Sequence, residues 1–339
     1  MRYGLLISPS ANRVYAESSV ALTRAELELF GRSALGDRIT DTELSTIGGV
    51  PYVTFTAELT ERDVAYLSNL SSVYALFSFE GELLRPVPLR PLDRYDDDLI
   101  TIQKYSGKTN EHFTKLLLNV TVLSSAFAGD LLDRRLRVLD PLCGRGTTLN
   151  QALMYGFDAA GMDVDGKDVE AYSAFLSTWL KRKRIKHHID TAPIRRNRQV
   201  VARRVHATLA ASREDHKAGA TQDVEVIGQD TVRAREFFRA GSFDVIVADA
   251  PYGVQHGSRT GAALARSPLE LLAAAAPVWR ELLRPGGAVG IAWNTHVAKR
   301  EDAAGLLADA GLEPLPLEGF RHRVDQSIAR DILTARRPA

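Results

Sequence analysis

Four stretches near the start of the chain have the pattern of strands: the first is an apolar run, and the last alternates apolar and polar residues with a period of two. These stretches are residues 3–8, 43–47, 50–56 and 73–79. Helical spacing follows two capping pairs between them, Thr23 with Glu26 and Thr60 with Asp63. The predicted order is strand, helix, strand, strand, helix, strand. This order is typical of the split βαβ, ferredoxin-like arrangement, an α+β fold.

The pattern changes after a segment that contains Pro86, Pro88, Pro91 and three consecutive aspartates. Such a segment is typical of an extended linker, and we place a domain boundary near residue 95. Beyond it, apolar strands alternate with helices, which indicates an α/β sheet. The predicted domains are therefore residues 1–95, with the linker, and residues 96–339.

Composition narrows the class of protein. With 339 residues, 45% of them hydrophobic and 25% charged, the chain is long enough for two globular domains. The single cysteine, Cys143, excludes a disulfide framework, and His187 and His188 lack ligand-type neighbours, so no metal is expected. The most apolar helix, near residues 269–283, contains charged side chains and is not expected to span a membrane. We expect a cytoplasmic protein.

Positive charge is concentrated in one part of the chain although the formal net charge is only +1. Ten basic residues and one acidic residue lie between residues 181 and 204, inside an apparent insertion at about residues 181–220. A solvated helix end is one explanation, and a phosphate-binding surface is the other. Further arginine clusters in the insertion favour phosphate contact. The candidate substrate-binding residues are Lys181, Arg182, Lys183, Arg184, Arg195, Arg196 and Arg198.

The clearest chemical signal is a strand at residues 136–140 that leads through Gly144 and Gly146 into a helix. Bare backbone at a helix N-terminus is suited to a nucleotide. A dinucleotide fingerprint requires a third glycine where Leu149 stands, which disfavours NAD. Asp140 suits an ammonium group, and Asp163, at the end of the next strand, suits two ribose hydroxyls. An amino acid joined to adenosine is S-adenosylmethionine.

The stretch Asp-Pro-Leu-Cys-Gly-Arg-Gly-Thr-Thr-Leu, which begins at Asp140, resembles the first motif of class I S-adenosylmethionine-dependent exocyclic-amino methyltransferases. This resemblance implies a Rossmann-like, seven-stranded sheet. The first 85 residues resemble the ferredoxin-like module of tRNA guanosine-N2 methyltransferases. The resemblance also implies contacts to adenine and to the methionine end of the cofactor. The candidate cofactor-binding residues are Asp140, Pro141, Cys143, Gly144, Gly146, Thr147, Asp163, Val164, Asp230, Thr231, Phe113 and Thr114.

A second motif follows the apolar strand at residues 243–248. Its residues Asp249, Ala250, Pro251 and Tyr252 resemble the Asp/Asn-Pro-Pro-Tyr motif of enzymes that methylate exocyclic amines. The lone pair of such an amine is delocalised, so a side-chain acceptor and a backbone carbonyl are needed to hold the amine in an attacking geometry. Asp249 and Ala250 have these implied roles, and Tyr252 offers a face for an extruded base. Ala250 departs from the usual proline.

These motifs together predict an S-adenosylmethionine-dependent methyltransferase that acts on an exocyclic amine of a nucleobase in RNA. Guanine N2 in tRNA is the substrate that the resemblance favours, so tRNA is the expected partner. Three alternatives remain open: a DNA amino methyltransferase, a methyltransferase for small molecules or peptides, and a catalytically silent RNA-binding protein. The sequence does not predict the oligomeric state.

Overall fold

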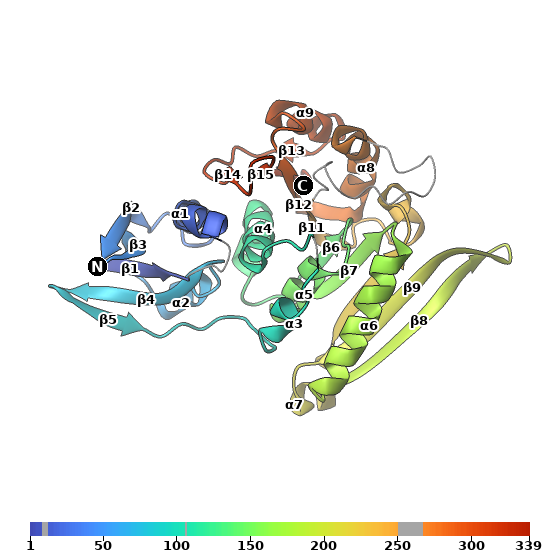
Figure 1. Ribbon diagram of the computed structural model, residues 1–339, viewed down its shortest axis with the longest axis horizontal. Helices are drawn as coiled ribbons and strands as arrows, with labels where there is room; N and C mark the ends of the chain where they lie inside the picture. The colour runs from blue at the N-terminus through green and yellow to red at the C-terminus, as the bar shows by residue number, and fades with distance from the viewer. Residues whose placement is uncertain (9–12, 106, 250–266) are drawn as a thin grey trace.

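The computed structural model describes residues 1–8, 13–105, 107–249 and 267–339. Figure 1 shows two sheets side by side, a small N-terminal one in blue and a large one that is covered by helices. The small sheet has five strands in the order β2-β3-β1-β4-β5, and all neighbouring pairs are antiparallel. Its strands are β1 (Arg2–Ile7), β2 (Thr40–Ile47), β3 (Val50–Thr56), β4 (Val73–Glu80) and β5 (Leu83–Val87).

Helices α1 (Arg13–Ala34) and α2 (Glu61–Leu67) complete the order that the sequence predicts for this unit. The capping box of α2, between Thr60 and Asp63, is present. The prediction for α1 is wrong, because this helix starts well before Thr23 and continues through Gly31. Thr23 donates its hydroxyl to the carbonyl of Ser19 inside the helix, and Glu26 is fully buried. A bond within the helix satisfies Thr23, and tertiary contacts with Ser71 and Asn119, which no local pattern reveals, satisfy Glu26.

The large sheet has ten strands among the described residues, in the order β13-β15-β12-β11-β6-β7-β10-β9-β8 with β14 beside β15. The sheet has three strands more than the predicted seven, because the insertion adds the β8–β9 hairpin to β10 and the two-residue strand β14 pairs with β15. The strands are β6 (Arg137–Asp140), β7 (Asp158–Asp163), β8 (Lys186–Arg196), β9 (Gln199–Ala210), β10 (Gln222–Gly228), β11 (Phe243–Asp249), β12 (Leu283–Asn294), β13 (Glu313–Pro314), β14 (His322–Arg323) and β15 (Ala329–Arg336).

Five neighbouring strands, β10, β7, β6, β11 and β12, run parallel. Successive residues of β11 pack into different cores: Val245 lies with the helices on one face and Ile246 with those on the other. Helices cover both faces, which makes this a mixed α/β sheet of the Rossmann-like kind. One layer contains α4 (Glu111–Ser124), α5 (Thr147–Met154) and α6 (Gly166–Arg182), and the other contains α8 (Pro268–Leu282) and α9 (Arg300–Asp309).

The two sheets share one continuous apolar core, which includes residues of α1 and of α4. A buried polar network crosses the same contact: the Glu26 carboxylate accepts from the side chain of Asn119 at 2.7 Å and from the hydroxyl of Ser71 at 2.6 Å. The chain passes between the units through the extended segment from β5 to the short helix α3 (Asp98–Thr101), where the boundary is predicted. Among the described residues, no helix is both long and apolar enough to cross a bilayer.

Candidate active site

Three carboxylates end three neighbouring strands of the parallel sheet. Asp163, Asp140 and Asp249 are the last residues of β7, β6 and β11, which lie in that order in the sheet. Because parallel strands present their carboxyl ends at the same edge, these acids meet there, as expected for an open α/β ligand site. The charges of Asp163 and Asp249 both act on Asp140 and help to raise its pKa. The structure therefore brings the three predicted acids together at one edge of the sheet.

Asp140 is the most enclosed of the three acids, with 3% of its surface exposed. Burial raises the pKa of Asp140 to about 7, and the two neighbouring carboxylates contribute in the same direction. A hydrogen bond from the backbone N–H of Leu142, at 3.0 Å, opposes this shift. A carboxylate in such surroundings is stabilised by any cation that reaches it, which fits the ammonium group of an amino-acid ligand.

Asp163 connects the second strand with the glycine turn. It accepts hydrogen bonds from the backbone N–H groups of Gly144, at 2.7 Å, and Asp165, at 2.8 Å. Burial raises its pKa, and these two bonds lower it. The side chain therefore holds the turn in place, and each oxygen retains a second lone pair that a ribose hydroxyl can use. The adjacent Val164 is 58% exposed.

The glycine turn is shaped by two left-handed residues, Gly144 with φ 47° and Gly146 with φ 79°. A Cβ atom on Gly146 would overlap the ring of Tyr172. Gly146 is also the N-cap of α5, and no side chain caps that end. The first N–H groups of this eight-residue helix are therefore available to a ligand. Pro141 and Cys143 are buried, and the Cys143 thiol packs against Gly161, so these two residues shape the turn.

Not all of the predicted cofactor-binding residues outside the glycine turn face the site. Asp230 caps the short helix η2 (Thr231–Glu236) through a bond from the N–H of Val232 at 3.1 Å. Thr231 is buried and accepts a hydrogen bond from the indole of Trp279 at 2.9 Å. Phe113 and Thr114 are buried in α4, and Phe113 packs against the Arg330 guanidinium, 4.2 Å from the ring centroid. Thr231, Phe113 and Thr114 thus face the protein interior, which local sequence patterns do not reveal.

Two residues outside the predicted set, Thr109 and Tyr105, lie at the site. Thr109 donates a hydrogen bond from its hydroxyl to Oδ2 of Asp249. The hydroxyl of Tyr105 lies 3.1 Å from that of Thr147, at the start of α5. Both lie shortly before Phe113 and Thr114, which the resemblance implies as cofactor contacts, and this proximity in sequence was the available signal. Ala250, Pro251 and Tyr252 lie outside the described residues.

The basic residues of the insertion do not form one surface. Lys186 pairs with Ala210 near the amino end of β10, whereas Arg203 pairs with Gly228 at its carboxyl end. The turn of the β8–β9 hairpin, with Arg195, Arg196 and Arg198, therefore extends past the edge that carries the acids. Residues 181–186 lie at the other end of β8, about 30 Å from this turn if each strand residue spans about 3.3 Å. Lys183 is there paired with Asp96 and Asp98, both at 2.7 Å.

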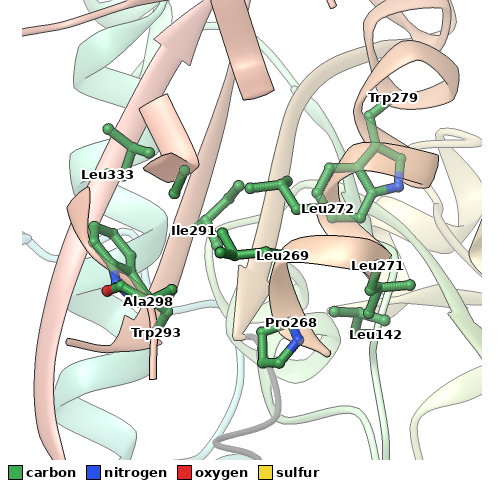
Figure 2. A pocket seen from close by; sticks show the side chains of 11 residues that line it. Leu142, Pro268, Leu269, Leu271, Leu272, Trp279, Ile291, Trp293, Ala298 and Leu333 are labelled. Carbon is green, nitrogen blue, oxygen red and sulfur yellow. The ribbon is translucent and has the colours of Figure 1, made fainter. Parts of the chain in front are cut away.

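An apolar cavity of about 30 Å³, partly open, lies between α8, α9 and the sheet, and Figure 2 shows the side chains that line it. Leu142 of the nucleotide turn reaches its wall, but Asp140, Asp163 and Asp249 do not line it. No cluster of three or more metal-ligating side chains occurs in the described part of the chain. The polar chemistry therefore belongs to the strand edge rather than to this cavity.

Residues 130–287 match the family model of the RMKL-like methyltransferase domain. This match contains all three acids and the glycine turn. No curated protein matches the chain in sequence.

Several solved structures are similar at low identity. A TehB-like SAM-dependent methyltransferase from Corynebacterium glutamicum is 14% identical, with a TM-score of 0.35, and the alignment covers 62% of this chain and 84% of that one. The N-methyltransferase NodS from Bradyrhizobium japonicum is 14% identical, with 67% and 95% coverage and a TM-score of 0.38. The 1,6-didemethyltoxoflavin-N1-methyltransferase of Burkholderia thailandensis, with bound S-adenosylhomocysteine, is 15% identical, with 70% and 94% coverage and a TM-score of 0.36.

These TM-scores are all below 0.5, so the assignment rests on the family match and on the strand edge rather than on the solved structures. The matched domain places an uncapped helix N-terminus beside the buried Asp140 and the half-buried Asp163, an arrangement that suits an amino acid joined to adenosine. The chain is a methyltransferase that takes its methyl group from S-adenosylmethionine.

Proposed function

We propose that this methyltransferase modifies an exocyclic amine of a nucleobase in RNA, and that the amine is guanine N2 in tRNA. The observation that carries the proposal is the position of Asp249. It ends β11 next to the two cofactor-side acids and begins the Asp-Ala-Pro-Tyr sequence. A carboxylate at this point can accept a hydrogen bond from the amine, draw the nitrogen lone pair out of conjugation, and direct it toward the donor.

The choice of guanine is supported by His322, whose ring is close enough to Asp249 for the carboxylate charge to act on it. His322 is 7% exposed, and its Nδ1 lies 3.0 Å from the carbonyl oxygen of Phe320. Burial lowers the pKa of His322 to about 4, so the ring is neutral at physiological pH and Nε2 is an acceptor when Nδ1 donates. Nε2 has no hydrogen-bond partner among the described residues. Guanine carries two adjacent donors, N1–H and the N2 amine, whereas adenine carries an acceptor beside its amine.

For the cofactor, we propose that Asp140 receives the ammonium group and Asp163 the ribose hydroxyls. Val164 would pack on the adenine, and Asp230 would approach its amino group. The N-terminus of α5, which no side chain caps, would face the same ligand, whereas the N–H of Gly146 is already bonded to the carbonyl of Cys143 at 2.7 Å. S-adenosylmethionine supplies an electrophilic methyl group at the site; the residues of this chain bind and orient it.

The protonation state of Asp140 should make the affinity for the cofactor depend on pH. The raised pKa of about 7 means that Asp140 loses its proton near neutrality, and only the ionised form attracts an ammonium group. Affinity for S-adenosylmethionine should rise about tenfold between pH 5.5 and 7.5, as expected for a group that titrates in this range. Calorimetric titration across these pH values measures it. In Asp140→Asn the affinity should be weaker and nearly constant with pH; a wild-type affinity that does not change would contradict the assignment.

For the RNA, we propose that the hairpin turn of β8 and β9 contacts backbone phosphates. Arg195 and Arg198 are exposed there and have no ion-pair partner among the described residues. Arg196 is held by Glu236, with N–O distances of 2.5 Å to its side chain and 2.6 Å to its carbonyl. The cluster at residues 181–184 is not part of this surface, because it lies at the opposite sheet edge.

Charge-reversal variants can distinguish the contributions of the two basic clusters, residues 195–198 and residues 181–184, to RNA binding. Arg195→Glu with Arg198→Glu should raise the KM for tRNA at least about tenfold, and should reduce the salt dependence of binding by about one unit of slope for each lost phosphate contact. The matched control is Lys181→Glu with Arg182→Glu, which makes the same change in charge at the other edge and should leave KM within about threefold. Equal effects of the two pairs would indicate only long-range attraction.

We further propose that the N-terminal unit is a ferredoxin-like module of the kind that precedes the catalytic domain in tRNA guanosine-N2 methyltransferases. Its strand order β4-β1-β3-β2 and the antiparallel pairing support this.

Incubation of the full chain with S-adenosylmethionine and unmodified bulk tRNA, followed by mass spectrometry of the nucleosides, tests the function. N2-methylguanosine is the expected product. N6-methyladenosine would contradict the choice of base. Methylation of genomic DNA but not tRNA, or of neither, would overturn the RNA assignment.

A further inference from the structure

We infer that Thr109 is a positioning residue for methyl transfer, because its hydroxyl fixes the orientation of the Asp249 carboxylate. The inference rests on the proposed role of Asp249 toward the target amine. The Thr109 Oγ donates a hydrogen bond to Oδ2 of Asp249, across 140 positions of the sequence. It is a direct contact between a side chain before α4 and the last residue of β11.

Thr109 is itself held in place by the start of α4. The next residue, Asn110, is the N-cap of that helix, and its side chain accepts from the N–H of Phe113 at 3.2 Å. Phe113, Leu116 and Leu117 are buried in the core that α4 forms with the sheet. The hydroxyl is therefore presented from a rigid helix end rather than from an unsupported loop.

The terminal side-chain torsion of aspartate, χ2, has a broad distribution, so the plane of an unsupported carboxylate varies over a wide range of orientations. A donor on Oδ2 restricts this plane and so sets the direction of the lone pairs that meet the amine. Alignment of the reacting atoms accounts for a large part of enzymatic rate enhancement, and a misplacement of about 1 Å can cost about 100-fold. Thr109 thus affects the rate through Asp249 without contact to the reacting atoms.

The segment that carries Thr109 is also attached to the cofactor side. Four positions earlier, the hydroxyl of Tyr105 lies 3.1 Å from that of Thr147, and the Arg145 guanidinium lies 4.8 Å from the Tyr105 ring centroid. Arg145 is in turn paired with Asp168 of α6 at 2.9 Å. The same stretch therefore touches both the helix that faces the cofactor and the acid that faces the amine. Loss of the Thr109 bond should disturb their alignment rather than either binding step.

The test compares Thr109→Val, which has the same shape without the donor, with Thr109→Ser, which keeps it. We expect Thr109→Val to lower kcat on tRNA by about 10- to 100-fold, with KM and S-adenosylmethionine affinity within about threefold of wild type. Thr109→Ser should restore kcat to within about threefold of wild type. An unchanged kcat in Thr109→Val, or equal losses in the two variants, would overturn the inference, and so would loss of cofactor binding.

A second measurement does not depend on the methyl acceptor. In a double-mutant cycle of Thr109→Val and Asp249→Ala, the shifts in Tm should be non-additive, because each single change removes the same bond. Additive shifts would overturn the inference. If wild-type protein methylates no nucleobase, the proposed function fails, while this cycle still reports on the contact between the two side chains.

Discussion

Replacement of Asp249 by alanine is expected to lower the rate of methyl transfer by at least about 100-fold, the usual cost of removing one polar group that stabilises a transition state. The carboxylate ends β11 beside Asp140 and is the side-chain acceptor proposed for the amine. It lies on the substrate side, so the affinity for S-adenosylmethionine should stay within about threefold of wild type. Single-turnover methylation of tRNA and calorimetry of cofactor binding measure the two quantities.

The control for this prediction is Asp249→Asn. Asparagine keeps one acceptor oxygen, and the motif that Asp249 resembles accepts either residue, so this variant should retain more activity than Asp249→Ala. Full activity of Asp249→Ala would show that the carboxylate is not needed for methyl transfer. A parallel loss of cofactor binding would indicate that Asp249 supports the cofactor side instead.

Gly146→Ala is expected to have the largest effect on the cofactor site and on stability. At φ 79° any side chain is strained, by about 1–2 kcal/mol. A Cβ atom would also overlap the buried ring of Tyr172, and such overpacking costs about 1–3 kcal/mol. We expect Tm to fall by about 5–10 °C and the Kd for S-adenosylmethionine to rise at least about tenfold, because the start of α5 must move. Calorimetry measures both.

Gly144→Ala is the matched control for stability. Gly144 also has a positive φ, 47°, but a Cβ atom there would meet nothing within 4 Å. Gly144→Ala should therefore destabilise the protein only through backbone strain, by about 1–2 kcal/mol. The fall in Tm should be less than half of that in Gly146→Ala. If the two variants unfold at the same temperature, the contact with Tyr172 is not what requires a glycine at position 146.

The motifs predicted the strand edge correctly because each of them is local. A strand that ends at Asp140, a turn with two glycines and a following helix can be recognised within a dozen residues, as can the capping box at Thr60. The segment around Thr23 and Glu26 has the same local signature, but Glu26 is turned into the contact with Asn119. A capping pattern depends only on residues that are neighbours in sequence, and a contact with a buried partner from another element can override it.

The amino-acid sequence by itself determined that Asp140, Asp163 and Asp249 end apolar strands, since hydrophobic periodicity and glycine turns act over short distances. Only the tertiary structure decided that Arg195 and Arg198 share an edge with these acids while residues 181–184 lie at the other. It also decided that Thr109 reaches Asp249. The physical reason is that strand register and helix packing join segments far apart in the chain, and no local pattern encodes the order in which they pair.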